Sequence, residues 1–548
     1  MAIVSELRMK YREAQLLYKR AQEGLKEEVG PKHVVTLTAT HRLAIVYSCL
    51  GKWKKGTDLY LSVLKSAEEK YGRDHEYTLS IVSSFGTHYL EQQESAKAEE
   101  MFLQAIKGYD RDPHRHGASM LTVKGGLARA LAQQGKKKQA EMTFLEALKG
   151  LKKFARRENT AVCRISFALG VFYMEQDNLL KAKKMFLSCL EGHETSSRGN
   201  SEEALKAAWK LGLIHDAMGN PSDAEPMLRR AHYGFKEVLG IFHTPTLESA
   251  KHLGSVCVAL GKYEDAEELC LFALEGLEKA LGPDDATTLG AAHELSKLYV
   301  QKLKLSLAKE HCQRALIGYM NLKEYGPDNG STLRIMSDMG SILAQIGPYD
   351  EAEKTFLKVI RGFSNAKQDS ISVEKQNVFL FGATLELGNL YSNQGKLELA
   401  RTKIQEAING FERALGRMGA KTLEAVLSLG NLATQPFSEA EMLIKRALNG
   451  FEQTLGRNHN STLNAAASLG YLYMQDSSQY YSKAAGLLER AVDGFEKNLV
   501  PDHPSTLEAM HRLGVLHFER GNTVDGEKFM NDAIKGFENG LGQTMLWL

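Results

Sequence analysis

The chain repeats itself with a period of 42 residues, and this repetition constrains its fold more than any other feature. A small residue stands in the middle of the first apolar stretch of each repeat, and six successive intervals are 42 residues long: Ala44, Gly86, Ala128, Gly170, Gly212, Gly254 and Ser296. The series continues at spacings of 44, 48, 42, 40 and 44, through Gly340, Gly388, Gly430, Gly470 and Gly514. Such a period indicates a solenoid of supersecondary units, each too thin to bury its apolar face alone.

Residues 246–285 show how one repeat is expected to fold. Apolar residues at helical spacing predict a first helix that ends near Gly261 and a second helix from about Tyr263 to Leu281. The small Gly254 is expected to let the two helices approach closely, and the hydroxyl of Thr246 to cap the first helix. The fold class is therefore predicted to be all-α: a right-handed α-solenoid of about twelve helix pairs, preceded by an N-terminal half repeat.

The repeats are predicted to form one continuous solenoid rather than separate domains. Its expected parts are a truncated half repeat at 1–35, repeats one to eight at 36–363, a polar loop at 364–378, and repeats nine to twelve with a C-terminal tail at 379–548. Solenoids usually begin with a polar capping unit. Because this one begins with half a repeat, we expect the chain to be a fragment of a longer protein, with an atypical cap as the alternative.

Charge and cysteine usage bear on the functional class. The formal net charge is only +2, so no global basic field indicates nucleic-acid binding. The six cysteines lie in predicted helices without CxxC spacing, and we interpret them as buried apolar residues in a reducing compartment, with no metal or cofactor predicted. Charged residues near the N-terminus and the lack of long apolar runs argue against a signal peptide and a membrane partner. A cytoplasmic location is expected.

The repeat resembles the tetratricopeptide repeat, on the evidence of Leu253-Gly254 in the first helix and of Tyr263, Ala266 and Ala273 in the second. The usual tetratricopeptide repeat is about 34 residues long. The longer period here resembles the repeats of kinesin light chain, and most closely the kinesin-light-chain-like arrays of fungal proteins. In those proteins such arrays often follow a nucleotide-binding or hydrolase domain. The resemblance implies a solenoid that binds protein partners of many kinds.

One departure from kinesin light chain limits what the resemblance implies. That family carries paired asparagines in the first helix of its cargo-binding repeats, whereas the matching stretch here is usually Leu-Gly, with asparagine only at Asn389 and Asn431. Recognition of cargo peptides by those asparagines is therefore not expected.

The first helix of each repeat is predicted to line the concave groove. Its exposed positions lie six and three residues before the small residue, and one and four after it. Six successive repeats place a cation there, and aromatic side chains accompany the cations: the predicted binding residues are Arg129, Arg164, Phe167, Lys206, Trp209, Lys251, His293, Lys297 and Arg334. Cations beside aromatic anchors suit an acidic, partly apolar segment.

Two functional classes remain open on the sequence alone. The favoured one is a non-catalytic scaffold that binds a protein or peptide, with an acidic segment as the expected ligand. The alternative is an enzyme or small-molecule-binding protein with a pocket enclosed by the superhelix, for example in a biosynthetic pathway, or the repeat region of a larger nucleotide-binding or hydrolase protein. No nucleophile, phosphate-binding loop or HExxH motif identifies catalytic residues.

Overall fold

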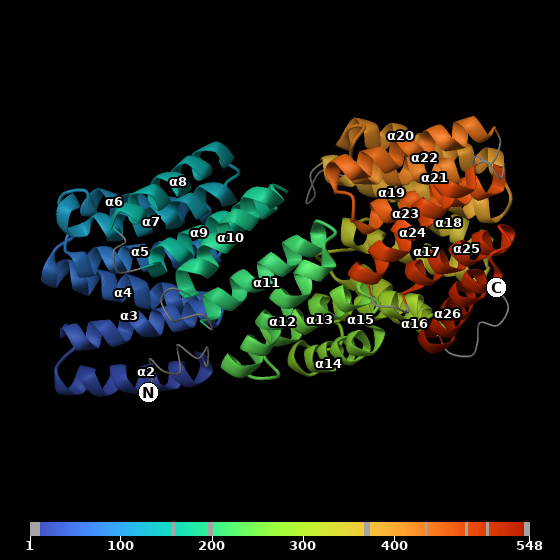
Figure 1. Ribbon diagram of the computed structural model, residues 1–548. Helices are drawn as coiled ribbons and strands as arrows, with labels where there is room; N and C mark the ends of the chain where they lie inside the picture. The colour runs from blue at the N-terminus through green and yellow to red at the C-terminus, as the bar shows by residue number, and fades with distance from the viewer. Residues whose placement is uncertain are drawn as a thin grey trace. The chain divides into compact units, whose positions relative to one another are not determined.

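The computed structural model describes residues 11–154, 159–194, 201–365, 373–432, 436–476, 480–499 and 503–541. Over these residues the chain forms 25 helices and no strand (Figure 1). Among the described helices, α2 stands alone and is followed by twelve pairs in which each odd-numbered helix precedes its even-numbered partner. The predicted all-α repeat array, with twelve pairs after a half repeat, is thereby confirmed. The right-handed sense of the superhelix stays a prediction.

Contacts divide the chain into two compact units. The first unit comprises Met1–Ile214 and Arg230–His243, and the second comprises His215–Arg229 and Thr244–Leu548. The first unit holds α2 (Tyr11–Glu28), α3 (Val34–Cys49), α4 (Trp53–Tyr71), α5 (Glu76–Glu91), α6 (Ser95–Tyr109), α7 (Pro113–Gln133), α8 (Lys137–Phe154), α9 (Asn159–Glu175) and α10 (Leu179–Glu194). The residues of α11 (Glu202–Ala217) and α12 (Pro221–Val238) are shared between the two units.

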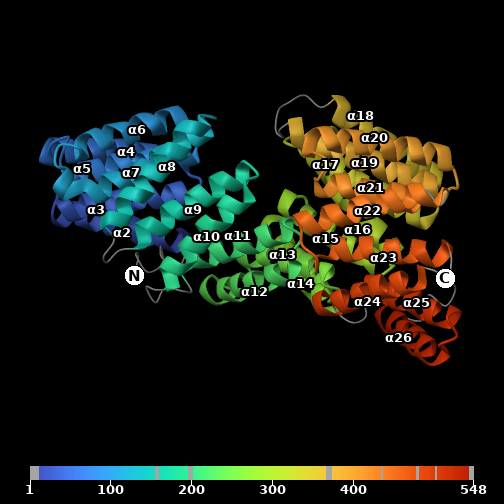
Figure 2. The same ribbon diagram turned by 45° about the horizontal axis from the view of Figure 1, so that its top comes forward.

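The second unit continues the same pairing (Figure 2). It holds α13 (Thr244–Ala259), α14 (Tyr263–Leu281), α15 (Ala286–Gln301), α16 (Leu305–Asn321), α17 (Gly330–Ile346), α18 (Tyr349–Asn365), α19 (Val373–Asn393), α20 (Leu397–Leu415), α21 (Ala420–Leu432), α22 (Phe437–Thr454), α23 (Asn460–Asp476), α24 (Tyr481–Asn498), α25 (Pro504–Glu519) and α26 (Thr523–Leu541).

The predicted subdivision at residues 35, 363 and 378 stays a prediction. Residues 366–372 of the polar loop predicted at 364–378 lie outside the described residues. Where it is described, helix replaces loop: α18 extends to Asn365 and α19 begins at Val373.

The small residue that marks each repeat lies where the two helices of a pair approach most closely. A Cβ atom added to Gly86 would lie 2.9 Å from the ring of Phe102, and one added to Gly340 would lie 2.9 Å from the ring of Phe356. At Gly254 the added atom would lie 2.6 Å from Sγ of Cys270 and 3.4 Å from the carbonyl oxygen of Ala266. The steric reason inferred from the 42-residue spacing is thus the one that the structure shows.

The residue that caps the odd-numbered helices is not the predicted threonine. The hydroxyl of Thr78 donates a hydrogen bond of 2.8 Å to the carbonyl of Gly72, in the turn before the helix, instead of accepting one from the backbone. The N-cap lies three residues earlier, at His75, whose Nδ1 accepts a bond of 3.2 Å from the backbone N–H of Tyr77. His503 caps α25 in the same way. At α5 the threonine therefore fixes the turn, and the side chain three residues earlier caps the helix.

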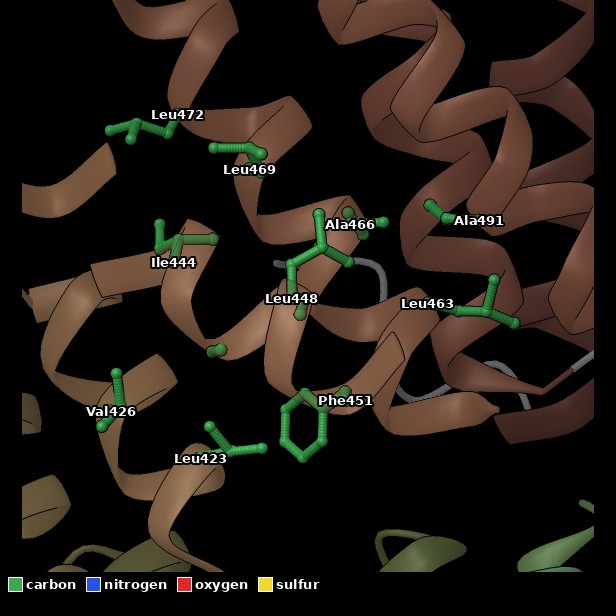
Figure 3. Close-up of a cluster of buried hydrophobic side chains, with 14 of the residues drawn as sticks. Leu423, Val426, Ile444, Leu448, Phe451, Leu463, Ala466, Leu469, Leu472 and Ala491 are labelled. Atoms are coloured by element: carbon green, nitrogen blue, oxygen red, sulfur yellow. The ribbon is translucent and has the colours of Figure 1, made fainter. Parts of the chain in front are cut away.

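Apolar side chains from successive helices form continuous cores within each unit. In the second unit the largest described cluster extends from α19 to α25, and Figure 3 shows its part on α21, α22, α23 and α24. Leu423, Phe451 and Leu463 belong to this cluster and are 0 % exposed. Each helix therefore buries one face against its partner and another against the next pair, as a solenoid requires. Among the described helices, none has a stretch long and apolar enough to span a membrane.

Candidate binding pocket on the odd-numbered helices

The odd-numbered helices form one side of each stack. Within the first unit α3 contacts α5, α5 contacts α7, and α7 contacts α9, and the second unit repeats this arrangement with α13 and α15 or α17 and α19. No pair of consecutive even-numbered helices makes comparable contacts among the described residues. Odd-numbered helices therefore lie closer together than even-numbered ones, which places them on the inner side of the curvature.

A pocket of about 500 Å³ opens on these helices in the first unit. Residues of α5, α7, α9 and α11 form most of its wall, and the second helices α6 and α8 contribute Phe102 and Phe144 to its floor. Both of these rings are 1 % exposed, so the floor is part of the apolar core. Gly126 also lines the pocket, and a Cβ atom there would lie 2.7 Å from the ring of Phe102. The absent side chain keeps the floor open.

Four of the nine predicted binding residues line this single pocket: Arg129, Arg164, Phe167 and Lys206. They come from three successive odd-numbered helices, α7, α9 and α11. The ring of Phe167 packs edge-on against that of Phe186 of α10, with 5.3 Å between ring centroids. The repeat positions chosen on sequence grounds therefore bring cations and an aromatic side chain together.

The three cations differ in how far they are neutralised. Arg129 forms an ion pair of 3.0 Å with Glu91 of α5, and Lys206 pairs with Glu202 one turn earlier on its own helix. No carboxylate pairs with Arg164 among the described residues, and its side chain is exposed. Arg164 is thus the cation with most of its hydrogen-bonding capacity left for a ligand, and a guanidinium can bind a carboxylate through two parallel bonds.

Two carboxylates that the sequence analysis did not select also line the pocket, Glu175 of α9 and Glu203 of α11. Burial raises the pKa of Glu175, and the positive charge of Lys210 opposes this. The wall is therefore mixed in charge rather than purely basic. Both residues escaped prediction because they lie outside the four repeat positions assigned to the groove.

Trp209 does not line the pocket. Its ring packs edge-on against Phe235 at 6.2 Å between centroids, and the ammonium of Lys210 lies 5.1 Å from its centroid. It belongs to a small core cluster with Leu205 and Ala208. Its packing explains why Trp209 is half-buried and not displayed toward a ligand.

The remaining predicted residues, Lys251, His293, Lys297 and Arg334, lie in the second unit, where ion pairs occupy two of them. Lys297 bonds Glu294 at 3.0 Å, and Nε2 of His293 lies 2.7 Å from Asp338. The guanidinium of Arg334 lies over the ring of Phe379 at 4.9 Å. Lys251 is half-buried. In this unit, Lys297 therefore pairs with a carboxylate on its own helix, and His293 pairs with one on the next odd-numbered helix.

The pKa values of Glu294 and Asp216 depend both on burial and on neighbouring charges. Burial disfavours the charged form of Glu294, but the charges of Lys297 and His293 outweigh it and hold the pKa of Glu294 at about 2. Burial and the nearby charge of Glu294 raise the pKa of Asp216, with Lys297 opposing. These groups form an internal network of alternating charge, and a network of this kind is most simply a structural element.

A smaller pocket of about 320 Å³ opens in the second unit. Its wall includes Asn431, Tyr471 and Arg512, and the guanidinium of Arg512 stacks on Tyr471 at 4.6 Å. Asn431 is one of the two asparagines at the position that kinesin light chain uses for cargo. It stands here without a second asparagine among the described lining residues.

The fold and these inner surfaces define a helical-repeat solenoid of stacked helix pairs. Residues 35–111 and 246–286 each match a family profile described as tetratricopeptide repeat. These two segments are thus tetratricopeptide repeats, and the resemblance seen in the sequence is confirmed. A search of curated proteins found no match.

Similar solved structures include BtubC (BKLC) from P. vanneervenii, with 17 % identity over 45 % of this chain and 94 % of that one, at a TM-score of 0.34. A Podosopora anserina putative kinesin light chain with nearly identical TPR-like repeats is 19 % identical over 38 % of this chain and 98 % of its own, also at 0.34. A single-substitution variant of that same protein is 20 % identical over 37 % of this chain and 96 % of its own, at a TM-score of 0.34.

Proposed function

We propose that the protein is a non-catalytic scaffold whose first unit holds a segment of a partner protein in the pocket on α5, α7, α9 and α11. The presence of tetratricopeptide repeats supports a role in protein interaction. One observation supports this pocket as the binding site: Arg129, Arg164, Phe167 and Lys206 line it together, above an aromatic floor.

The chemistry of the wall suggests what the partner segment contains. An apolar side chain fits against Phe102, Phe144 and Phe167, where burial of its surface contributes about 25 cal/mol per Å². A neighbouring carboxylate fits Arg164, the cation without an ion-pair partner among the described residues. Glu175 and Glu203 repel further negative charge, so the pocket favours one or two carboxylates beside an apolar anchor over a polyanion.

A second candidate is a small organic acid as the ligand. The pocket volume of about 500 Å³ supports it, because sites for small molecules usually measure about 300–1,000 Å³. An enzymatic role and a place within a larger nucleotide-binding or hydrolase protein belong to this same alternative class.

Selection of displayed random peptides on the full chain tests the proposal. We expect enrichment of sequences in which Asp or Glu adjoins a large apolar residue, and affinities that fall as salt rises, because exposed charges are screened over about 10 Å at 0.1 M. The double variant Arg164→Glu/Lys206→Glu should lose the selected peptides. Lys184→Glu, an exposed cation on α10 that does not line the pocket, is the matched control.

Two outcomes would contradict the scaffold. Peptides that bind the double variant as well as the wild type would show that the pocket is not their site. Failure to enrich any consensus, together with thermal stabilisation of the wild type but not the double variant by small carboxylic acids, would favour the second candidate.

A further inference from the structure

Three side chains with metal-binding chemistry meet inside the first unit, between α9 and α10. Cys163 lies on α9, and Cys189 and His193 lie on α10. Their candidate ligand atoms all lie within 4.8 Å of one another. The three residues are 1 %, 0 % and 3 % exposed. They take no part in the pocket lining.

Helix geometry explains why they converge. Cys189 and His193 are four residues apart, so they occupy one face of α10, one turn from each other. Cys163 lies on the partner helix, and the pair is held close by Gly170, where an added Cβ atom would lie 2.9 Å from the ring of Phe186. The ligand atoms are thus carried by two regular helices in a packed pair, which fixes their positions better than a loop would.

The environment orients the imidazole. Nδ1 of His193 lies 3.1 Å from the hydroxyl of Ser201, just before α11. A hydrogen bond to one ring nitrogen is the usual way in which proteins orient a ligating histidine, and it assigns the ligand role to the other nitrogen, Nε2.

We propose that Cys163, Cys189 and His193 form a binding site for a thiophilic d¹⁰ metal ion, with Zn²⁺ as the occupant. Bonds of about 2.3 Å to sulfur and 2.0–2.1 Å to nitrogen place tetrahedral donors roughly 3.5–3.8 Å apart, a separation that fits within the observed limit. The two thiols lose two protons when they bind one Zn²⁺, and the resulting two thiolates balance its double positive charge, as a buried site requires.

Three protein ligands leave the fourth tetrahedral position to a water molecule or another exogenous ligand. The ion would fasten α9 to α10. Because Cys163 directly precedes Arg164, and Phe167 follows one turn later, it would also fix the part of α9 that lines the pocket. The metal site nevertheless stands on its own geometry and does not depend on the proposed partner.

No metal site is predicted from the sequence because the six cysteines lie in predicted helices and show no CxxC spacing. The local signal is Cys189 and His193 at i and i+4, which is common by chance. Cys163, the third ligand, is 26 residues from Cys189 in the sequence and reaches it only through the helix pairing.

Titration of the reduced, chelator-treated full chain with Co²⁺ and then Zn²⁺ tests the site. We expect one equivalent of Co²⁺ to produce thiolate charge-transfer bands in the near ultraviolet and ligand-field bands in the visible. The binding of Co²⁺ should release about two protons per ion at neutral pH. Zn²⁺ should then displace Co²⁺ and bleach both sets of bands without further proton release. A wild-type chain without thiolate bands would overturn the proposal.

Variants assign the ligands. Cys163→Ser, Cys189→Ser and His193→Gln should each weaken Zn²⁺ binding by at least about 10–100-fold, the loss seen even for outer-shell partners. Cys270→Ser is the matched control, since Cys270 is equally buried on the second helix of another pair, α14, outside the cluster. Circular dichroism before metal addition verifies folding. Unchanged affinity in the Cys189→Ser variant, or an equal loss in the control, would refute the assignment.

Discussion

Arg129 of α7 bonds Glu91 of α5 at 3.0 Å, at the wall of the pocket in the first unit. The ion pair joins neighbouring odd-numbered helices and partly neutralises Arg129, whereas Arg164 in the same wall has no such partner among the described residues. The two arginines occupy corresponding surfaces of successive repeats, but they are not equivalent for a ligand.

This difference predicts unequal effects of charge removal. Arg164→Gln should weaken binding of an acidic peptide by about 2 kcal/mol, the loss typical of a central interface arginine. Arg129→Gln should weaken it by less than about 1 kcal/mol, because a half-exposed, already paired side chain contributes little. Isothermal titration of one selected peptide against both variants measures the difference. Equal losses would show that the Glu91 pair opens on binding.

Filling the pocket should abolish binding without removing any charge. Ala168 lines the wall and is half-exposed, so Ala168→Trp places a ring in the open space. We expect complete loss of the peptide. The thermal midpoint should stay close to wild type, since changes at exposed positions usually alter stability by about 0.5 kcal/mol or less. Ala168→Ser, which adds one oxygen only, is the control. Peptide binding by the tryptophan variant at wild-type affinity would place the ligand elsewhere.

The pairing of Lys297 with Glu294 predicts a stability defect in the second unit. Lys297→Met leaves Glu294 without its main counter-charge, and removal of one partner of a fully buried pair costs about 3–5 kcal/mol. Because the side chain of Lys297 is 39 % exposed, we expect a smaller loss, on the order of 1–2 kcal/mol. Urea denaturation measures it. Glu294→Gln/Lys297→Met should recover most of the loss, and a double variant no more stable than the single one would argue against the pair.

Gly219, in the turn between α11 and α12, predicts another defect. It has a φ of +75°, and a Cβ atom there would lie 2.7 Å from Nε2 of His459, in the turn between α22 and α23. Gly219→Ala should therefore lower the thermal midpoint more than Gly395→Ala, where φ is +70° but nothing lies within 4 Å of the added atom. The left-handed strain, about 1–2 kcal/mol, is common to both variants. An equal shift would mean that the contact with His459 contributes nothing.

The fold could be predicted from the sequence because its main determinant is steric and local. A small residue every 42 positions marks the close approach of two helices, as Gly86, Gly254 and Gly340 show. The helix caps were missed although the signal was present. The capping residues share one position three residues before the recurrent threonine: His33, His75, Asp285 and Asn329. Asp and Asn are typical caps. Because histidine takes the same position in other repeats, Nδ1 of that histidine was the expected acceptor of the hydrogen bond from the helix backbone.

The site could be predicted only in part. Repeat position fixes which side of a helix a residue occupies, and this was enough to bring Arg129, Arg164 and Phe167 into one pocket. It does not fix the partner of a charge. The carboxylate that pairs with His293 lies 45 residues away, on the next odd-numbered helix, and the ring that covers Arg334 of α17 likewise lies on the next odd-numbered helix, α19. Such pairing depends on the relative rotation of neighbouring helices, which composition and spacing do not specify.

His41 of α3 predicts how stability depends on pH. Burial, with a smaller contribution from the charge of Arg42, lowers its pKa from 6.5 to about 4. The ring lies edge-on to Tyr60 and Tyr77, with centroids 5.9 and 6.5 Å away. Since the folded form resists protonation, the unfolded chain binds more protons between these two pKa values. The contribution of His41 to the free energy of unfolding should therefore be constant above pH 6.5, fall as the pH decreases from 6.5 to 4, and level off below pH 4.

For one such group, the slope of the free energy of unfolding against pH approaches about 1.4 kcal/mol per pH unit. Urea denaturation of the wild type and of His41→Gln at about pH 7.5, 6.0 and 5.0, values that bracket this window, measures it. The variant is expected to be less stable at the highest pH, because the glutamine packs less well between the two tyrosines, but to lose less stability on acidification. Other histidines with lowered pKa values, such as His88 and His503, remain in both proteins, so the test is the difference between the two slopes. Parallel curves would show that His41 is protonated in the folded protein as easily as in the unfolded chain.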